Sequence, residues 1–138
     1  MSNVTQIQST DKMEAMVNSI KDDGTGGTNV ANNKEYSGSF GGKNGVYNTK
    51  ESASGKPSGG KPLETIGTVD FHSHPSGTEK ITIKGESYTG SWAQPPSKQD
   101  ISVSGNKSQY VVGMGNGTIY IYNKNGVIAT IPLSTFKK

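Results

Sequence analysis

The chain has 138 residues, of which 29% are hydrophobic and 19 are glycine, so we expect a single domain over residues 1–138 with a small core and many loops. It has no cysteine, which excludes disulfides and thiolate metal sites, and no apolar stretch that predicts a membrane span or an N-terminal secretory signal. The net charge is +3, but the 14 basic residues are all lysines scattered along the chain, so we expect neither a nucleic-acid nor a membrane partner.

One helix is predicted near the N-terminus. Apolar residues recur there at helical spacing, and they predict a helix over residues 11–21: Met13, Met16, Val17 and Ile20. Thr10 or Asp11 is the expected N-cap, and residues 1–10 are the expected loose lead-in.

A β-hairpin and a flexible loop are predicted next. The turn signal Asn44-Gly45 lies between β-type segments at residues 36–40 and 46–49, which predicts two antiparallel strands. Residues 51–62 are rich in glycine, serine and lysine, a composition typical of a flexible surface loop.

A further strand is predicted over residues 66–74, and Pro75 should end it. Successive side chains of a strand point to opposite faces. Val69 and Phe71 are therefore expected on one face, and the polar side chains are expected on the other: Asp70, His72 and His74.

The rest of the chain predicts strands and a short helix. A small hairpin is expected from residues 81–84 and 87–91, and a helix is expected over residues 97–104. A C-terminal meander is expected, with strands over residues 110–114, 118–122 and 127–132. The predicted fold class is α+β: a mixed, mostly antiparallel sheet with one N-terminal helix and a short second helix.

The two histidines are the first candidates for chemistry. His72 and His74 leave the same face of a strand with their Cβ atoms about 6–7 Å apart, close enough to bind one metal ion. Asp100, at the start of the predicted second helix, and Glu35, at the start of the first strand, offer carboxylates. Two histidines and one carboxylate leave a tetrahedral zinc ion one open position for water, and a second carboxylate can serve as general acid/base.

Three short motifs resemble, in the same order, those of the JAMM (JAB/MPN+) zinc metallopeptidases: Glu35-x-x-Gly38, His72-x-His74-Pro75 and Pro96-Ser97-x-x-Asp100. The resemblance implies that His72, His74 and Asp100 bind Zn²⁺. It implies that Glu35 is the general acid/base and that Ser97 steadies the substrate oxyanion or the attacking water. The implied activity is hydrolysis of peptide or isopeptide bonds in a protein or peptide substrate, with ubiquitin-like proteins as one class.

The spacing between the second and third motifs departs from the family pattern. Residues 75–96 separate them, which is longer than usual, so residues 76–94 are an expected insertion that shapes access of the substrate. The small, glycine-rich build is similar to the JAB-like domains of bacterial polymorphic (RHS-type) toxins. That resemblance implies an immunity protein as a further partner.

Several of these residues have other interpretations. The pattern Ser97-x-x-Asp100 is also a helix capping box, which is compatible with metal binding. Asp70 shares the predicted face of the histidines, where it could orient an imidazole or lie at a solvated edge.

Other glutamates and other functions also remain open. Glu51 lies in the predicted flexible loop and Glu64 lacks a glycine at the matching position, which favours Glu35 as the acid/base. A JAMM-like binding module or a toxin domain without peptidase activity is the alternative function. A metal-dependent toxin acting on nucleic acid is a third, disfavoured by the absence of arginine.

Overall fold

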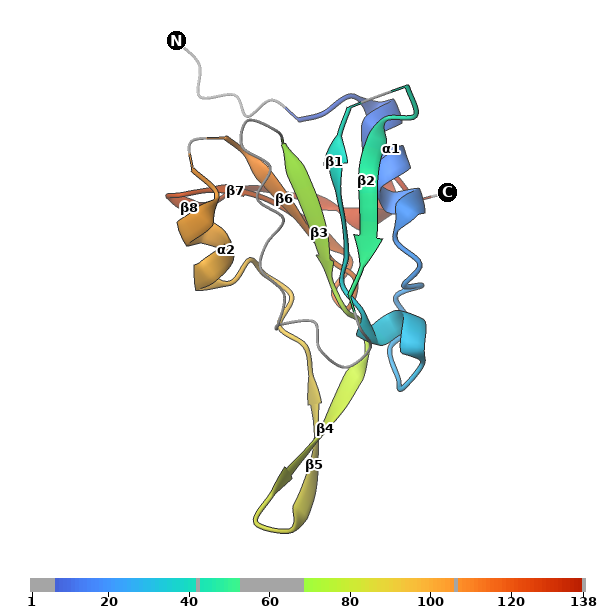
Figure 1. The fold of residues 1–138 in the computed structure, drawn as a ribbon, viewed down its shortest axis with the longest axis vertical. Helices are drawn as coiled ribbons and strands as arrows, with labels where there is room; N and C mark the ends of the chain where they lie inside the picture. The colour runs from blue at the N-terminus through green and yellow to red at the C-terminus, as the bar shows by residue number, and fades with distance from the viewer. Residues whose placement is uncertain (1–6, 42, 53–68, 106, 138) are drawn as a thin grey trace.

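The computed structural model describes residues 7–41, 43–52, 69–105 and 107–137, and this part of the chain forms a six-stranded sheet with a separate two-stranded hairpin (Figure 1). In chain order the elements are α1 (Thr10–Ser19), the 3-10 turn η1 (Val30–Asn33), β1 (Tyr36–Phe40), β2 (Val46–Glu51), β3 (Asp70–His74), β4 (Thr78–Ile83), β5 (Glu86–Ser91), α2 (Lys98–Val103), β6 (Gln109–Gly113), β7 (Thr118–Asn123), β8 (Gly126–Pro132) and the 3-10 turn η2 (Leu133–Thr135). The strand order is β2-β1-β3-β6-β7-β8, and only the β3–β6 pair of this sheet is parallel. The predicted α+β class, with its mixed and mostly antiparallel sheet, is confirmed.

Helix α1 closes the core on one face of the sheet. Met13, Met16 and Val17 are buried, as their helical spacing predicts, and they pack in one apolar cluster with aromatic side chains of the strands, Phe40 and Phe71 among them. Burial of this apolar stripe stabilises a helix whose sequence alone has only moderate helical propensity.

The predicted cap of α1 is wrong. Ser9, not Thr10 or Asp11, is the N-cap, and no side chain makes a capping hydrogen bond there. The Met13 N–H donates instead to the backbone oxygen of Ser9 at 2.9 Å, so the helix starts one residue earlier than expected. The predicted lead-in, residues 1–10, is therefore too long by one residue, because Thr10 belongs to α1. Residues 1–6 lie outside the described part of the chain.

Strand β3 lies at the centre of the sheet, between β1 and β6. Its burial alternates as predicted: Phe71 faces the core beneath α1, and His72 and His74 therefore face the other way, toward α2. The strand ends at His74, directly before Pro75, and the expected strand residues 66–68 lie outside the described residues.

Strand β2 is longer than predicted. It runs to Glu51, where the composition predicts the start of the flexible loop. The strand reaches this residue because Ser52, the next residue, hydrogen-bonds to Glu35 through its backbone and its side chain. The remainder of that predicted loop, residues 53–62, lies outside the described residues.

The predicted insertion forms a hairpin that extends away from the sheet (Figure 1). Strands β4 and β5 are joined by Lys84 and Gly85, both with positive φ, 52° and 80°, the conformation of a type I′ turn. The hairpin returns the chain to the sheet, where α2 follows.

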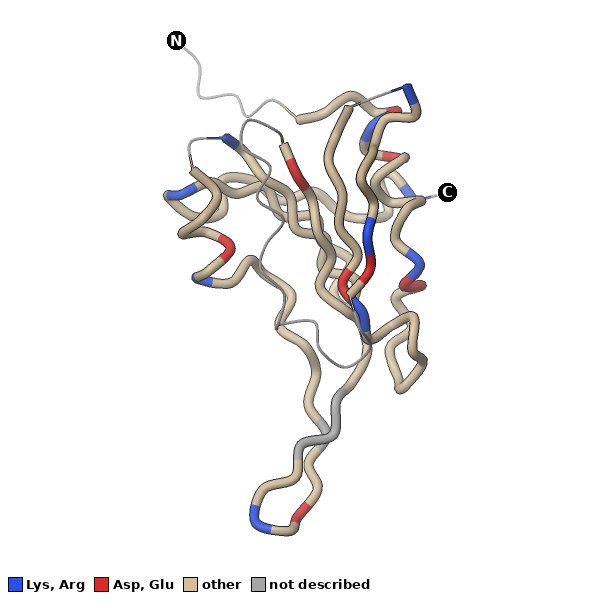
Figure 2. Tube along the Cα trace, viewed as in Figure 1, with Lys and Arg blue, Asp and Glu red and all other residues tan. Residues whose placement is uncertain are grey.

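Charged side chains are distributed over many elements. Figure 2 places lysines on strands, turns and helices of the described chain rather than along one element. Among the described residues, no helix is long and apolar enough to cross a membrane.

Candidate metal centre

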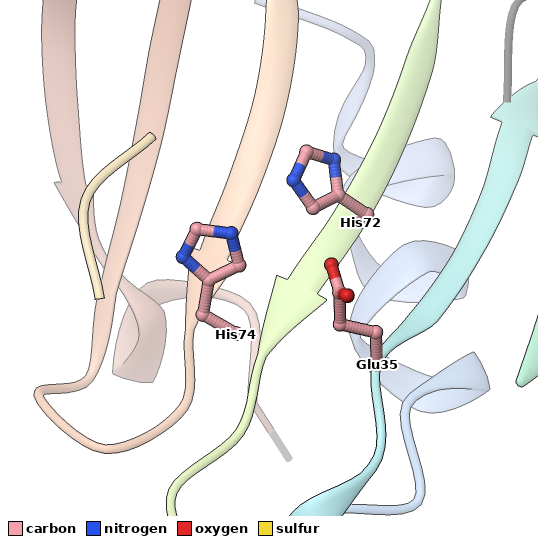
Figure 3. A group of neighbouring side chains, drawn as sticks. All are labelled: Glu35, His72 and His74. Carbon is pink, nitrogen blue, oxygen red and sulfur yellow. The ribbon is translucent and has the colours of Figure 1, made fainter. Parts of the chain in front are cut away.

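The pairing of β1 with β3 brings Glu35 to the histidines. Ser37 pairs with His72, and extending this antiparallel register by two residues places Glu35 opposite His74. Figure 3 shows the Glu35 carboxylate and both imidazoles directed toward one shared space. One ligand atom from each of Glu35, His72 and His74 lies within 4.8 Å of the others, so the three could hold a metal ion.

Backbone contacts fix Glu35 on both sides. Its N–H donates to the Ser52 Oγ, and the Ser52 N–H donates to the Glu35 carbonyl oxygen, each at 2.8 Å. The next N–H, of Tyr36, donates at 2.9 Å to the Oγ of Ser73, a fully buried side chain. These bonds hold the general-acid/base candidate in register with the histidine strand.

Ser73 is a residue that sequence reasoning missed. It occupies the spacer between the two histidines, where the alternation of β3 turns its side chain to the buried face. A buried hydroxyl requires a hydrogen-bond partner, and the first amide of the neighbouring strand supplies one. The sequence signal that could have indicated this role is a serine at a strand position whose side chain faces the core.

Asp100 reaches the same place from the first turn of α2. Its Oδ2 lies 3.2 Å from Nε2 of His72 and 3.4 Å from Nε2 of His74. The same oxygen accepts the Ser97 N–H at 2.8 Å, while the Ser97 Oγ accepts the Asp100 N–H at 3.0 Å. The capping box is therefore present, and it presents Asp100 to the histidines at a fixed angle.

His74 is oriented from its other ring nitrogen. The Nδ1 lies 2.9 Å from the backbone oxygen of Gln94, and because a carbonyl can only accept, Nδ1 bears the hydrogen. The Nε2 is thereby turned toward Asp100. The side chains of His72, His74 and Asp100 are 17%, 13% and 11% exposed, so water can still reach the group.

The electrostatics separate the two carboxylates. Burial raises the pKa of Glu35, and the charges of His72 and His74 oppose this shift only in part. Burial alone would also raise the pKa of Asp100, but hydrogen bonds from His72 and His74 outweigh it and hold that pKa well below its ordinary value. Asp100 is therefore ionised at neutral pH, whereas Glu35 takes up a proton more readily.

The pKa of His74 follows from its partners. Burial alone would lower it, but the hydrogen bond to Asp100 and the charge of that carboxylate raise the pKa of His74 above its ordinary value. Acceptors lie at both ring nitrogens, Gln94 O at one and Asp100 at the other, and together they favour the imidazolium in the metal-free protein.

The other acidic candidates lie elsewhere or outside the described residues. Glu51 is exposed at the end of β2, where its carboxylate pairs with Lys34 at 3.0 Å and Lys21 at 3.7 Å. Glu64 lies outside the described residues. Asp70 accepts a hydrogen bond from the Ser39 Oγ at 2.6 Å, across the β1–β3 pair.

Comparisons of the chain with protein-family models, with curated proteins and with solved structures gave no match in any of the three. The support for a metal site is therefore the geometry of the side chains. Glu35, His72 and His74 form a group that could hold a metal ion, and Asp100 contacts both histidines.

Proposed function

We propose that this protein is a zinc-dependent hydrolase of peptide or isopeptide bonds, in which His72, His74 and Asp100 hold the metal ion and Glu35 is the general acid/base. The observation that supports it most directly is the position of the Asp100 Oδ2, which lies close to both imidazole Nε2 atoms. Glu35, directly before β1, and the two histidines of β3 form a group that could hold a metal ion, which supports the same assignment.

The spacing of these atoms suits a zinc ion. Zinc bonds to imidazole nitrogen and carboxylate oxygen are about 2.0–2.2 Å long, which places the ligand atoms of a tetrahedron about 3.3–3.6 Å apart. The two distances from Asp100 to the histidines, 3.2 and 3.4 Å, are close to that spacing. Two neutral imidazoles and one carboxylate are also a donor set typical of hydrolytic zinc sites.

Glu35 is suited to proton transfer. A zinc ion bound to the other three residues supplies a Lewis acid that lowers the pKa of a water ligand toward about 7. Glu35 accepts a proton as the water oxygen bonds to the substrate carbonyl carbon. It then gives that proton to the amine nitrogen as the C–N bond breaks, so that a carboxylic acid and an amine leave. Burial raises its pKa above the ordinary value, which favours its second role as the proton donor.

Ser97 has a proposed role beside its capping role. Its Oγ accepts the Asp100 N–H, which leaves the hydroxyl hydrogen available as a donor. The side chain is exposed and adjoins the Asp100 carboxylate, where it can donate to the developing oxyanion of the substrate.

The class of substrate follows from the motif order. The order of Glu35, the two histidines and Asp100 along the chain resembles the order of the motifs in JAMM metallopeptidases. This resemblance supports a protein or peptide substrate, with ubiquitin-like proteins as one class. The segments that lead into and out of the β4–β5 hairpin adjoin His74, at Pro75 and at Gln94, and this position supports a role of the hairpin in access of a protein substrate. The resemblance to toxin domains adds an immunity protein as a partner to test.

Metal analysis and one conservative substitution test the proposal. Elemental analysis of the purified protein should find about one zinc per chain, and His72→Ala should remove it. Glu35→Gln should keep the zinc and abolish hydrolysis of peptide and isopeptide substrates, because the amide cannot accept the proton. Glu51→Gln, at an exposed glutamate of β2, is the matched control and should retain activity.

Two outcomes would count against the hydrolase. A chain without zinc, whose melting is unchanged by chelator, would refute the metal site. Bound zinc with no turnover on peptide or ubiquitin-like substrates would favour the JAMM-like binding module.

A further inference from the structure

Gln94 lies where the β4–β5 hairpin returns to the sheet, and its backbone oxygen accepts the Nδ1–H of His74 at 2.9 Å. This is the contact that turns the Nε2 of His74 toward Asp100. In metal sites, a partner on the second ring nitrogen of a histidine ligand sets both the orientation and the basicity of the ring. The position of this one carbonyl therefore matters to the site.

The side chain of Gln94 fixes the position of that carbonyl. Its Nε2 donates to the backbone oxygens of Pro75 and Trp92, at 2.9 and 2.8 Å. Its Oε1 accepts the N–H of Gly115, in the β6–β7 turn, at 2.7 Å. One amide thus joins the residue after His74, the end of the hairpin and the turn after β6, which lies beside β3 in the sheet.

Two glycines leave space for this amide. A Cβ on Gly113 would lie 3.1 Å from the Cβ of Gln94, and a Cβ on Gly115 would lie 3.0 Å from its Cδ. Both approaches are closer than ordinary carbon–carbon contact. Alanine at either position would press on the Gln94 side chain, so the β6–β7 segment is shaped to receive it.

We propose that Gln94 is a positioning residue of the metal centre, whose side-chain amide holds its own carbonyl against Nδ1 of His74 and so directs Nε2 of that histidine to the metal position. This inference rests on the proposed function in taking His74 as a ligand. It goes beyond that function by placing the control of ligand geometry in the segment that follows β5. Because Gln94 also binds Pro75 and Trp92, the two ends of the hairpin are tied together at the ligand itself.

Two substitutions separate the contributions of the amide. Gln94→Glu keeps an oxygen for the Gly115 N–H but removes both donors, and Gln94→Ala removes all three bonds. Gln99→Ala is the matched control, because Gln99 is an exposed glutamine on α2. All variants are made in the full chain.

The first measurement needs no metal. NMR of the ¹⁵N-labelled, metal-free protein at about pH 6, where the imidazole is protonated, should detect the hydrogen-bonded Nδ1–H of His74 as a proton protected from exchange with water. The signal should be lost in Gln94→Ala, weakened in Gln94→Glu and unchanged in Gln99→Ala. A residue that only stabilised the fold would lower the melting temperature without affecting this proton.

The second measurement is zinc affinity by competition with a chelator. We expect about 10–100-fold weaker binding in Gln94→Ala, a smaller loss in Gln94→Glu and wild-type affinity in Gln99→Ala. A protected Nδ1–H together with wild-type zinc affinity in both Gln94 variants would overturn the inference. Failure of the wild-type protein to bind zinc would instead refute the proposed function, and the NMR comparison would still decide whether Gln94 positions His74.

Discussion

Asp100 combines two roles, helix cap and proposed metal ligand, and a pair of substitutions should separate them. Asp100→Asn removes the carboxylate charge between the histidines but keeps a side-chain oxygen that can accept the Ser97 N–H. Ser97→Ala removes the other half of the capping box and leaves the Asp100 carboxylate in place. The two variants should therefore have opposite defects.

The expected magnitudes follow from the contacts. Loss of a partner that only orients a metal ligand weakens binding about 10–100-fold, so loss of the ligand itself should cost at least about 100-fold. At a zinc concentration about 100 times the wild-type Kd, zinc stabilises the wild-type protein by about 2.7 kcal/mol, but it stabilises an Asp100→Asn protein by only about 0.4 kcal/mol. For 138 residues, about 3 °C of melting temperature corresponds to 1 kcal/mol, so zinc should raise Tm by about 8 °C in the wild type and by about 1 °C in Asp100→Asn.

Differential scanning calorimetry of each variant, with chelator and with zinc, gives the melting temperature of the metal-free protein and the rise in melting temperature on zinc binding. In chelator, Ser97→Ala should melt about 3 °C below the wild type, because loss of an N-cap serine costs about 1 kcal/mol. It should nevertheless show the full zinc-induced rise. An Asp100→Asn protein with the wild-type zinc-induced rise would refute Asp100 as a ligand and leave Glu35, His72 and His74 as the metal-holding group.

Two further predictions concern parts of the fold that surround the site. Ser73→Ala should lower the free energy of unfolding in urea by about 1–3 kcal/mol, because it leaves the Tyr36 N–H without its acceptor at a buried position, and an unchanged unfolding midpoint would contradict this role. Hydrogen bonds from Thr25, together with one from Asn32, lower the pKa of Asp23 from 3.8 to about 2, so its stabilising contribution is complete above the unfolded-state pKa and is lost as the pH falls through about 2. An NMR titration of the Asp23 carboxyl should have its midpoint near 2 and Asn32→Ala should raise it, whereas a wild-type midpoint at the ordinary value would contradict the arrangement.

The part of the site that could be predicted from the sequence is the part set by local periodicity. The period of two in β3 places His72 and His74 on one face, and a proline directly after them predicts where the strand ends. The turn signals likewise predicted the hairpins, because Gly45 and Gly126 have the positive φ that such turns need. The motif order predicts that these groups converge: Glu35 and the histidines form a group that could hold a metal ion, Asp100 contacts both histidines, and the set of four as one site stays a prediction.

The parts that could not be predicted depend on contacts between distant segments. The local sequence around Ser73 does not predict that this side chain accepts the Tyr36 N–H, because the two residues are 37 positions apart. Likewise, the local sequence around Gln94 does not predict its bond to His74, 20 positions away. The composition around Glu51 predicts a loop, whereas pairing with β1 extends β2 to this residue. Tertiary pairing overrides local composition in such segments.

The way the site is assembled bears on how strongly the fold depends on metal. The long connection from His74 to Asp100 suggests that zinc is needed to bring them together, but the structure supplies other means. Sheet register places Glu35 and the histidines, the capping box orients Asp100, and the hairpin returns the chain through Gln94. With the proposed ligand atoms already 3.2 and 3.4 Å apart, an ion would replace carboxylate–imidazole contacts and would not have to draw distant groups together. A preorganised site loses little conformational entropy on binding, so zinc should add stability to a protein that is already folded, and chelation should lower its melting temperature without unfolding it at room temperature.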